Sequence, residues 1–145
     1  MNKLLKNLII ACTCTVFIMA LSACGETAEQ PQKLQLELEA NSSTGYFWTV
    51  SDSEIFQIED EYVEAEQEGD EMMVGVPGTM KYVLTAEKPG QETLEFVYAQ
   101  GDIVETCIRY SFKVNDDLTV EFLEKEIITP KNALKVDYPD PEVIK

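Results

Sequence analysis

The sequence predicts an all-β domain, an antiparallel sandwich of about seven to eight short strands. Apolar and polar residues alternate with a period of two along most of the chain after residue 32, and turn residues separate these runs. No segment keeps an apolar stripe of 3.6-residue period over the length of a helix. Such alternation buries one face of each strand and leaves the other in water, as in a sandwich of two half-wet sheets.

Strands are expected where the alternation is clearest. The first run, 33–40, places Leu34, Leu36, Leu38 and Ala40 on one face and charged or amide side chains on the other. An acidic stretch holds two short candidates, and a turn at 88–91 separates two of the later runs. In chain order, the expected strands are 33–40, 46–50, 55–58 with 62–63, 80–86, 93–98 and 107–114.

The pattern changes after residue 114, so we expect a sandwich at 33–114 followed by a C-terminal extension at 115–145. Leu118, Val120 and Phe122 alternate, which predicts an additional strand within 118–128 that extends a sheet edge. Three prolines and few apolar residues follow from 129 onwards. Residues 129–145 are therefore predicted to form an irregular tail, which either packs across the domain or stays mobile.

The first 24 residues have the layout of a secretory signal. Lys3 and Lys6 precede an apolar run at 8–21, and Leu21-Ser22-Ala23-Cys24 closes the segment. This ending resembles the bacterial lipobox, which implies that 1–23 are removed and that Cys24 carries at least a two-chain glyceride, with acyl groups such as palmitate. A plain cleaved signal and a single membrane span are the alternatives, although the apolar run is short for a span of about 20 residues.

Lipidation of Cys24 would hold the mature domain on the extracytoplasmic face of a cell membrane, or in a periplasm. Residues 25–32 are then a polar tether that reaches about 26–29 Å when fully extended. Cys12 and Cys14 would be removed with the signal segment 1–23. Because Cys107 then has no cysteine partner, no intrachain disulfide is expected.

Composition excludes several classes of function. The 27 acidic against 11 basic residues give a formal net charge of −16, whereas nucleic-acid binding needs a basic face. The chain has no histidine, which removes Ser–His and Cys–His pairs and the commonest metal ligand. Cys107 falls on an outward strand face without a plausible base, and the acidic run 59–71 lacks the spacing of a calcium loop. A charged strand edge that discourages aggregation explains the acidic run better. From the composition as a whole, we expect a monomeric protein that is not an enzyme and binds neither cofactor nor metal.

A polar loop at 41–46 indicates a recognition function. Its residues are Asn41, Ser42, Ser43, Thr44, Gly45 and Tyr46, and Phe47 and Trp48 follow directly. Asn, Ser and Thr side chains hydrogen-bond neighbouring backbone groups, and glycine accepts a positive φ, so the loop is expected to hold its own shape. A pre-shaped loop loses little conformational freedom on docking. Alternation assigns Trp48 to the core, whereas Tyr46 is either a core residue or an interface anchor.

This hexapeptide resembles the first binding loop of chagasin-type inhibitors of papain-like cysteine proteases, whose pattern is Asn-Pro-Thr-Thr-Gly-Tyr/Phe, often with a Trp two residues later. The two serines depart from that pattern, Ser42 standing for the proline and Ser43 for the first threonine. The residues that match it are Asn41, Thr44, Gly45, Tyr46 and Trp48.

The family's other two loops are matched less well. Its second pattern, Gly-x-Gly-Gly, resembles Gly75-Val76-Pro77-Gly78, in which Pro77 replaces a glycine. An ordinary loop with glycine turns is the alternative for this segment. The third pattern, Arg-Pro-Trp, is absent, since its expected place holds Ala99-Gln100-Gly101-Asp102.

The resemblance covers roughly 34–114 and implies an immunoglobulin-like sandwich. It also implies a lipid-anchored inhibitor of a papain-like protease, either the cell's own or a host's. Loops 41–46, 75–78 and 99–102 would occlude the active-site cleft reversibly, with Gln100, Gly101 and Asp102 in the third loop. Two alternatives remain: an immunoglobulin-like surface lipoprotein that binds another protein without inhibiting it, and an accessory subunit that docks through the C-terminal extension.

Overall fold

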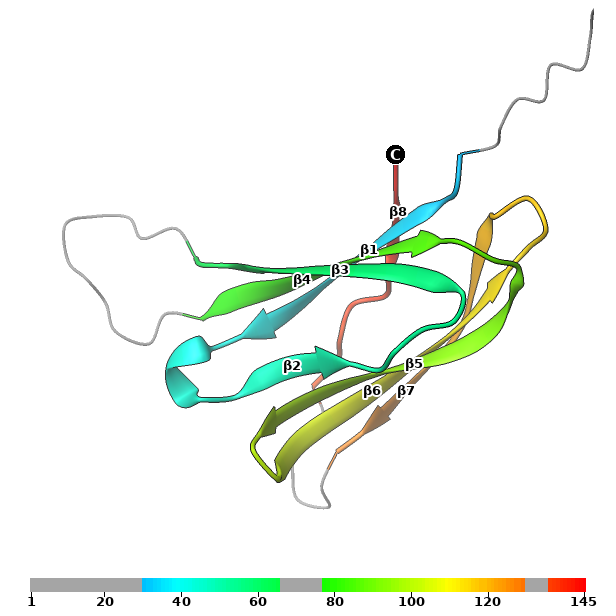
Figure 1. The fold of residues 1–145 in the computed structure, drawn as a ribbon. Helices are drawn as coiled ribbons and strands as arrows, with labels where there is room; N and C mark the ends of the chain where they lie inside the picture. Colours follow the sequence, from blue (N-terminus) through cyan, green and yellow to red (C-terminus); the bar gives the residue numbers. More distant parts are fainter. Residues whose placement is uncertain (1–29, 66–76, 130–135) are drawn as a thin grey trace, which may run out of the picture.

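The computed structural model describes residues 30–65, 77–129 and 136–145. Within these residues the chain forms eight strands and one short 3₁₀ helix. Two four-stranded antiparallel sheets pack face to face (Figure 1). The predicted all-β, immunoglobulin-like sandwich is confirmed.

Each sheet draws strands from distant parts of the chain. The first sheet has the order β3-β4-β1-β8, and the second has the order β2-β5-β6-β7. The strands of the first sheet are β1 (Lys33–Ala40), β3 (Phe56–Val63), β4 (Gly78–Ala86) and β8 (Glu142–Ile144). Those of the second are β2 (Phe47–Val50), β5 (Gly90–Gln100), β6 (Ile103–Val114) and β7 (Val120–Ile128), and the helix η1 is Ser42–Thr44.

The core lies between the sheets and follows the alternation in the sequence. Every second residue of β1 is buried, from Leu34 to Ala40, and β4 and β6 show the same pattern over most of their length. Aromatic rings fill the centre, where Phe96 meets Tyr82 at 5.0 Å and Tyr110 at 5.5 Å in edge-to-face geometry. Such pairs add to the free energy gained from apolar burial alone.

Two short strands expected at 55–58 and 62–63 are in fact one strand, β3. The reason is pairing, because all eight of its residues align with β4. β3 is an edge strand, and its acidic residues Glu59, Asp60 and Glu61 are exposed. Charged residues on an exposed edge discourage pairing with other chains.

The sandwich continues past residue 114, beyond the boundary expected from the sequence. β7 lies within the range predicted for an additional strand and pairs with β6. Residues 142–144 were expected to be irregular, but they form β8 and pair with the start of β1. The intervening 136–141 therefore pass between the two sheet edges, as Figure 1 shows.

Lys125 and Tyr110 hold this C-terminal segment in place. The Tyr110 hydroxyl donates to the Pro139 carbonyl at 2.7 Å. The Lys125 ammonium lies 2.9 Å from the Asp140 carboxylate and 3.4 Å from that of Asp137, and it also donates to the Tyr138 carbonyl. The hydrogen bonds that the Lys125 ammonium donates to the Asp140 and Asp137 carboxylates raise the pKa of Lys125, although partial burial opposes them.

Replacing Lys125 with Ala is expected to lower the free energy of unfolding by about 1 kcal/mol, since its carboxylate partners are exposed and water screens them. Because the folded-state pKa of Lys125 is raised, its contribution is complete at neutral pH and is lost as the pH rises above the ordinary lysine value. Urea unfolding at pH 7 measures the effect, and Lys113→Ala, at an exposed pair with Glu121, serves as the control. Equal losses in both variants would contradict a special role of Lys125 in holding the C-terminal segment.

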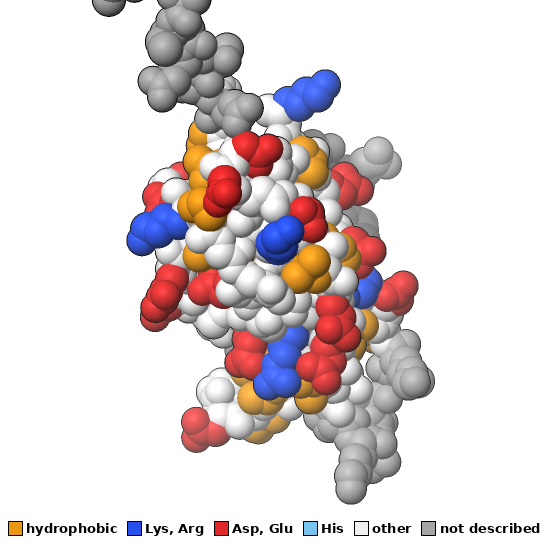
Figure 2. All heavy atoms as spheres, turned by 90° about the vertical axis from the view of Figure 1, so that its right-hand side faces the viewer, with side chains coloured by type: hydrophobic (Ala, Val, Ile, Leu, Met, Phe, Trp, Pro, Cys, Tyr) orange, Lys and Arg blue, Asp and Glu red, His pale blue; other side chains and the backbone are white. Residues whose placement is uncertain are grey.

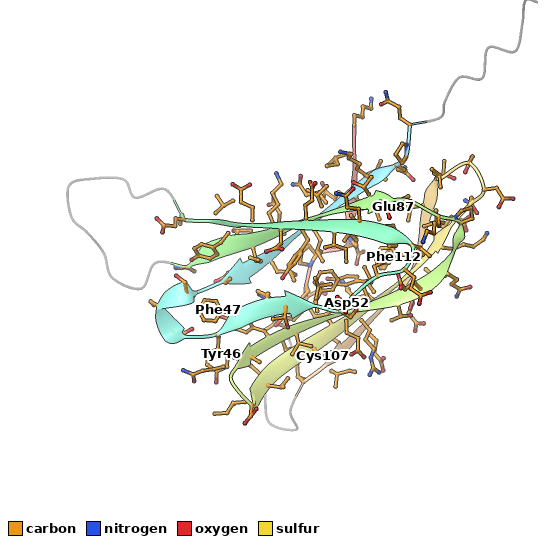
Figure 3. All side chains as sticks on the ribbon, viewed as in Figure 1. Tyr46, Phe47, Asp52, Glu87, Cys107 and Phe112 are labelled. Carbon is orange, nitrogen blue, oxygen red and sulfur yellow. The ribbon has the colours of Figure 1, made fainter. Side chains whose placement is uncertain are left out.

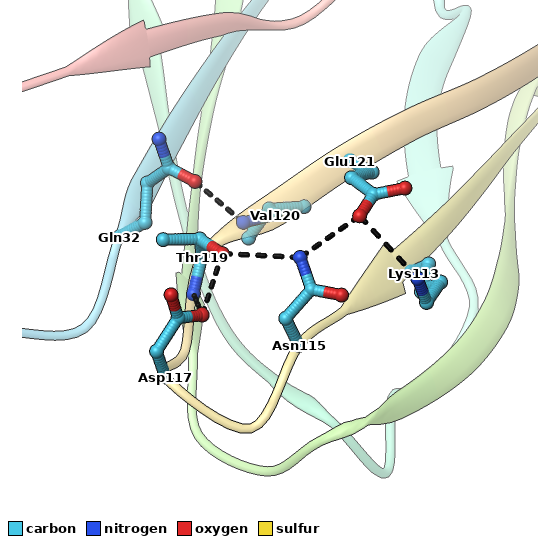
Figure 4. Close-up of polar contacts among 7 residues, drawn as sticks. All are labelled: Gln32, Lys113, Asn115, Asp117, Thr119, Val120 and Glu121. Carbon is cyan, nitrogen blue, oxygen red and sulfur yellow. Dashed lines mark hydrogen bonds and ion pairs between the residues drawn. The ribbon is translucent and has the colours of Figure 1, made fainter.

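The chain enters the sandwich at the end opposite to the 41–46 loop. Gln32 lies at the entry, where its amide donates to the Leu118 carbonyl at 3.2 Å and its carbonyl accepts from Ala86 at 3.0 Å. Figure 4 shows the polar contacts around the 115–119 turn at this end. The predicted signal 1–23 and Cys24 lie outside the described residues. Among the residues that are described, no helix is long and apolar enough to cross a membrane.

Candidate functional site

The loop at 41–46 is held by its own hydrogen bonds. The Asn41 side-chain oxygen caps η1 by accepting from the Ser43 amide at 3.1 Å and from the Ser43 hydroxyl at 2.6 Å. The Asn41 carbonyl accepts from the Thr44 amide at 3.1 Å and from the Thr44 hydroxyl at 2.7 Å. Gly45 ends the helix with φ 77°, a positive φ of the kind that glycine accepts without strain.

Aromatic side chains support the loop from beneath. Tyr98 packs against Tyr46 at 5.4 Å and against Trp48 at 4.9 Å, and its hydroxyl accepts from the Asn41 amide at 3.3 Å. The Trp48 indole donates to the Glu39 carbonyl at 2.9 Å and is only 5% exposed. The prediction of Trp48 as a core residue is confirmed. Tyr46 is half-buried and contacts only Tyr98 of this stack; Figure 3 shows Tyr46 at the loop end of the sandwich.

The expected loop at 99–102 is shorter than the sequence suggested. Ala99 and Gln100 belong to β5, so only Gly101 and Asp102 form the turn to β6. The prediction of a longer loop was wrong because Gln100 pairs with Ile103 across the hairpin. The Gln100 side chain also donates to the Thr44 carbonyl at 3.2 Å. The first loop and the third hairpin are therefore joined into one surface.

The second predicted loop is described only in part, because Gly75 and Val76 lie outside the described residues. Pro77 is exposed, and Gly78 is the first residue of β4, paired with Ala40. Gly78 was expected in a loop, but it lies in a strand. Its lack of a side chain allows the end of β3 to approach closely. A Cβ there would lie 2.6 Å from the Val63 carbonyl oxygen, so only glycine fits.

Three exposed apolar side chains at the same end were missed by the sequence reasoning. Phe47 is 58% exposed, Ile103 62% and Val104 49%. Phe47 and Val104 both align with Ala99, so they lie in one row across β2, β5 and β6. Figure 3 shows Phe47 beside the loop. Alternation did place Phe47 outward, but only the short hairpin reveals that Ile103 and Val104 share its end of the sandwich. Clusters of this kind commonly mark protein interfaces.

Within the described parts of the chain, no group of His, Cys, Asp or Glu side chains could hold a metal ion. Cys107 lies on the outward face of β6 and is partly exposed, as expected. Burial and the nearby Glu95 carboxylate raise the pKa of the Cys107 thiol. The reactive thiolate is therefore disfavoured at neutral pH.

Gly45→Ala should lower the free energy of unfolding more than Gly101→Ala does. Both glycines have positive φ, 77° and 57°, so both variants strain the backbone to a similar degree. At Gly45, however, the added Cβ would lie 2.9 Å from the Gln100 side-chain nitrogen, so that this flexible side chain must turn away and lose its hydrogen bond to the Thr44 carbonyl, whereas at Gly101 the Cβ meets no atom within 4 Å. We expect Gly45→Ala to cost about 1–2 kcal/mol and Gly101→Ala less. Urea denaturation compares the two, and equal losses would show that the Gln100 contact has no weight.

Taken together, the sandwich and its pre-shaped loop end define a binding protein that presents a rigid polar tip beside exposed apolar side chains. A model of the chagasin family of peptidase inhibitors, I42, matches residues 27–115, which is more than half of the chain. The chain belongs to this family, and the resemblance seen in its first loop is confirmed. No curated protein and no solved structure matches it.

Proposed function

We propose that this chain is a lipid-anchored inhibitor of papain-like cysteine proteases that blocks the active-site cleft reversibly. Membership of the chagasin family supports a cysteine protease as the partner. The observation that carries the mechanism is the 41–46 loop, which hydrogen bonds and the Tyr98 ring hold in shape without a partner. Little conformational entropy is then lost when the loop enters a cleft.

The loop backbone explains why the inhibitor resists cleavage in this proposal. Ser42–Thr44 form a 3₁₀ turn, whereas proteases cut peptides that lie extended across their active site. Thr44, at the tip, faces the catalytic centre, and its carbonyl is already held by Gln100. No bond to the protease forms, so inhibition is non-covalent. Loop tips of this extent can supply a protease–inhibitor contact of about 1,600 Å² in total.

Apolar side chains at the loop end replace the missing Arg-Pro-Trp motif. Arg and Trp frequently dominate interface energy, so their absence requires a substitute. Phe47, Ile103 and Val104 are exposed beside the hairpin that would have carried the motif. We assign them to one wall of the cleft, and Pro77 and Gly78 to the other.

The two ends of the sandwich fit an anchored inhibitor. Residues 30–32 enter opposite the loop end, as Figure 1 shows. A lipid on Cys24 and a tether at 25–32, reaching about 26–29 Å, would therefore point the loops away from the membrane. A soluble protease could then approach the loops without obstruction.

A surface lipoprotein that binds without inhibiting is the second candidate, and the loss of Arg-Pro-Trp favours it. Titrating papain and a cathepsin-type protease with residues 25–145 separates the two. The proposal predicts reversible inhibition that is competitive with substrate and has an inhibition constant in the nanomolar range. An unchanged rate at micromolar concentrations of the domain would contradict inhibition and favour the binding module.

A further inference from the structure

A cavity of about 310 Å³ lies directly beside the first loop. Residues of both sheets and of the C-terminal segment line it, and Asn41 and Pro77 contribute to its edge. At ~30 Å³ for each water, about ten water molecules would fill this volume, which is enough for one long side chain. A partner that covers the first loop therefore also covers the cavity.

Aromatic rings form one part of the cavity wall. Trp48 and Tyr98 lie 4.9 Å apart with their planes at 30°, and Tyr138 meets Trp48 edge-on at 5.8 Å. All three line the cavity. The face of an aromatic ring attracts a cation, and the attraction strengthens when the site is shielded from water.

Carboxylates complete the wall. Glu39 and Glu105 line the same cavity and are exposed. Burial raises the pKa of the Tyr138 hydroxyl; a hydrogen bond with Thr106 opposes this, and the Glu105 and Glu39 carboxylates add to it. Lys125, which binds the backbone of Tyr138, is already paired with Asp137 and Asp140. Among the described residues that line the cavity, none is Lys or Arg.

We propose that this cavity receives a lysine or arginine side chain of the target protease, from the rim of its active-site cleft. The inference rests on the proposed function. The aliphatic stem of such a side chain packs against Trp48 and Tyr138, and its charged head remains near Glu105 at the exposed mouth. Charge favours this occupant, since the formal net charge of the chain is −16. Figure 2 shows the opposite end of the sandwich, where acidic and basic side chains lie interspersed.

The cavity can be tested without a protease, because Trp48 is the only tryptophan of the chain and reports on it by fluorescence. The probes are N-acetyl-arginine amide and its neutral analogue N-acetyl-citrulline amide, which has nearly the same shape. We expect a saturable change with arginine, with an apparent dissociation constant in the millimolar range, and at least about tenfold weaker binding of citrulline. Identical curves for the two probes, or no saturation with arginine, would overturn the proposal.

Two variants give the experiment its controls. Glu105→Gln should weaken arginine binding about threefold to tenfold, whereas Glu124→Gln, at an exposed carboxylate on β7, should have no effect. Lys131 and Lys135 lie outside the described residues, so the double variant Lys131→Gln, Lys135→Gln tests whether the chain fills its own cavity. Stronger arginine binding by that double variant would identify an internal occupant and overturn the proposal.

Inhibition assays then separate this inference from the proposed function. We expect Glu105→Gln to raise the inhibition constant about threefold to tenfold and to flatten its dependence on salt. If wild type and Glu105→Gln inhibit equally at every salt concentration, the cavity has no such role although inhibition stands. If arginine binds the cavity but no protease is inhibited, the proposed function fails, and with it the assignment of the ligand to a protease.

Discussion

Thr44→Arg should abolish inhibition while leaving the domain folded. Thr44 lies at the tip of the loop, where its hydroxyl donates to Asn41 and its carbonyl accepts from Gln100. An arginine there adds a long charged side chain at the point that enters the cleft and removes the bond to Asn41. We expect inhibition to weaken about a thousandfold or more, as when a central interface residue is lost. A steady-state titration of papain measures this.

Thr93→Arg is the matched control, because it makes the same change at an exposed residue near the start of β5, whereas the opposite end of this strand lies beside the first loop. It should inhibit like wild type. For Thr44→Arg itself, the free energy of unfolding should fall by about 1–2 kcal/mol, since the residue is exposed and its hydroxyl loses two hydrogen bonds, to the Asn41 carbonyl and from the Tyr46 amide. Full inhibition by Thr44→Arg would contradict the placement of this loop in the cleft.

Trp48→Ala should destabilise the domain by about 3–5 kcal/mol. The Trp48 side chain is 5% exposed, contacts the rings of Tyr98 and Tyr138, and donates to the Glu39 carbonyl. Its removal leaves a large void beneath the first loop. Because a domain of this size is stable by only about 5–15 kcal/mol, much of the population should unfold in mild urea. Circular dichroism during urea titration measures the shift.

The neighbouring variant Phe47→Ala should show the opposite profile. Phe47 is 58% exposed, so its truncation should change the free energy of unfolding by no more than about 0.5 kcal/mol. Inhibition should nevertheless weaken about tenfold or more, since the ring lies on the surface assigned to the cleft wall. Similar stability losses in the two variants would refute the assignment of Trp48 to the core and Phe47 to the surface.

The strands were predictable because alternation is a local property. The bounds of β1 and the buried side of β4 and β6 follow directly from the order of apolar residues. The same holds for Gly45, since a short polar loop that ends in glycine needs a positive φ at that residue. The acidic part of β3 was harder to predict, because pairing with β4 extends the strand through residues of low β-propensity.

Features that depend on distant residues could not be predicted. β8 forms because β1 has a free edge and because Lys125 and Tyr110 hold the preceding segment. Gln100 was predicted as a site residue, but its hydrogen bond to Thr44, 56 residues away in the sequence, depends on the hairpin pairing. The cavity likewise combines residues of both sheets with Tyr138 of the C-terminal extension. No sequence motif signals such a combination.

Inhibition as proposed depends on a pre-shaped loop end that fills an open active-site cleft. Chemical-shift mapping tests this directly, with isotope-labelled domain mixed with unlabelled papain, either free or with its cleft blocked by a covalent peptide inhibitor. We expect large amide shifts confined to 41–47, 77–78 and 98–104 with the free enzyme, and none with the blocked enzyme. Equal shifts with both enzymes, or shifts centred on β7 and the 115–119 turn, would contradict the placement of the loop end in the cleft.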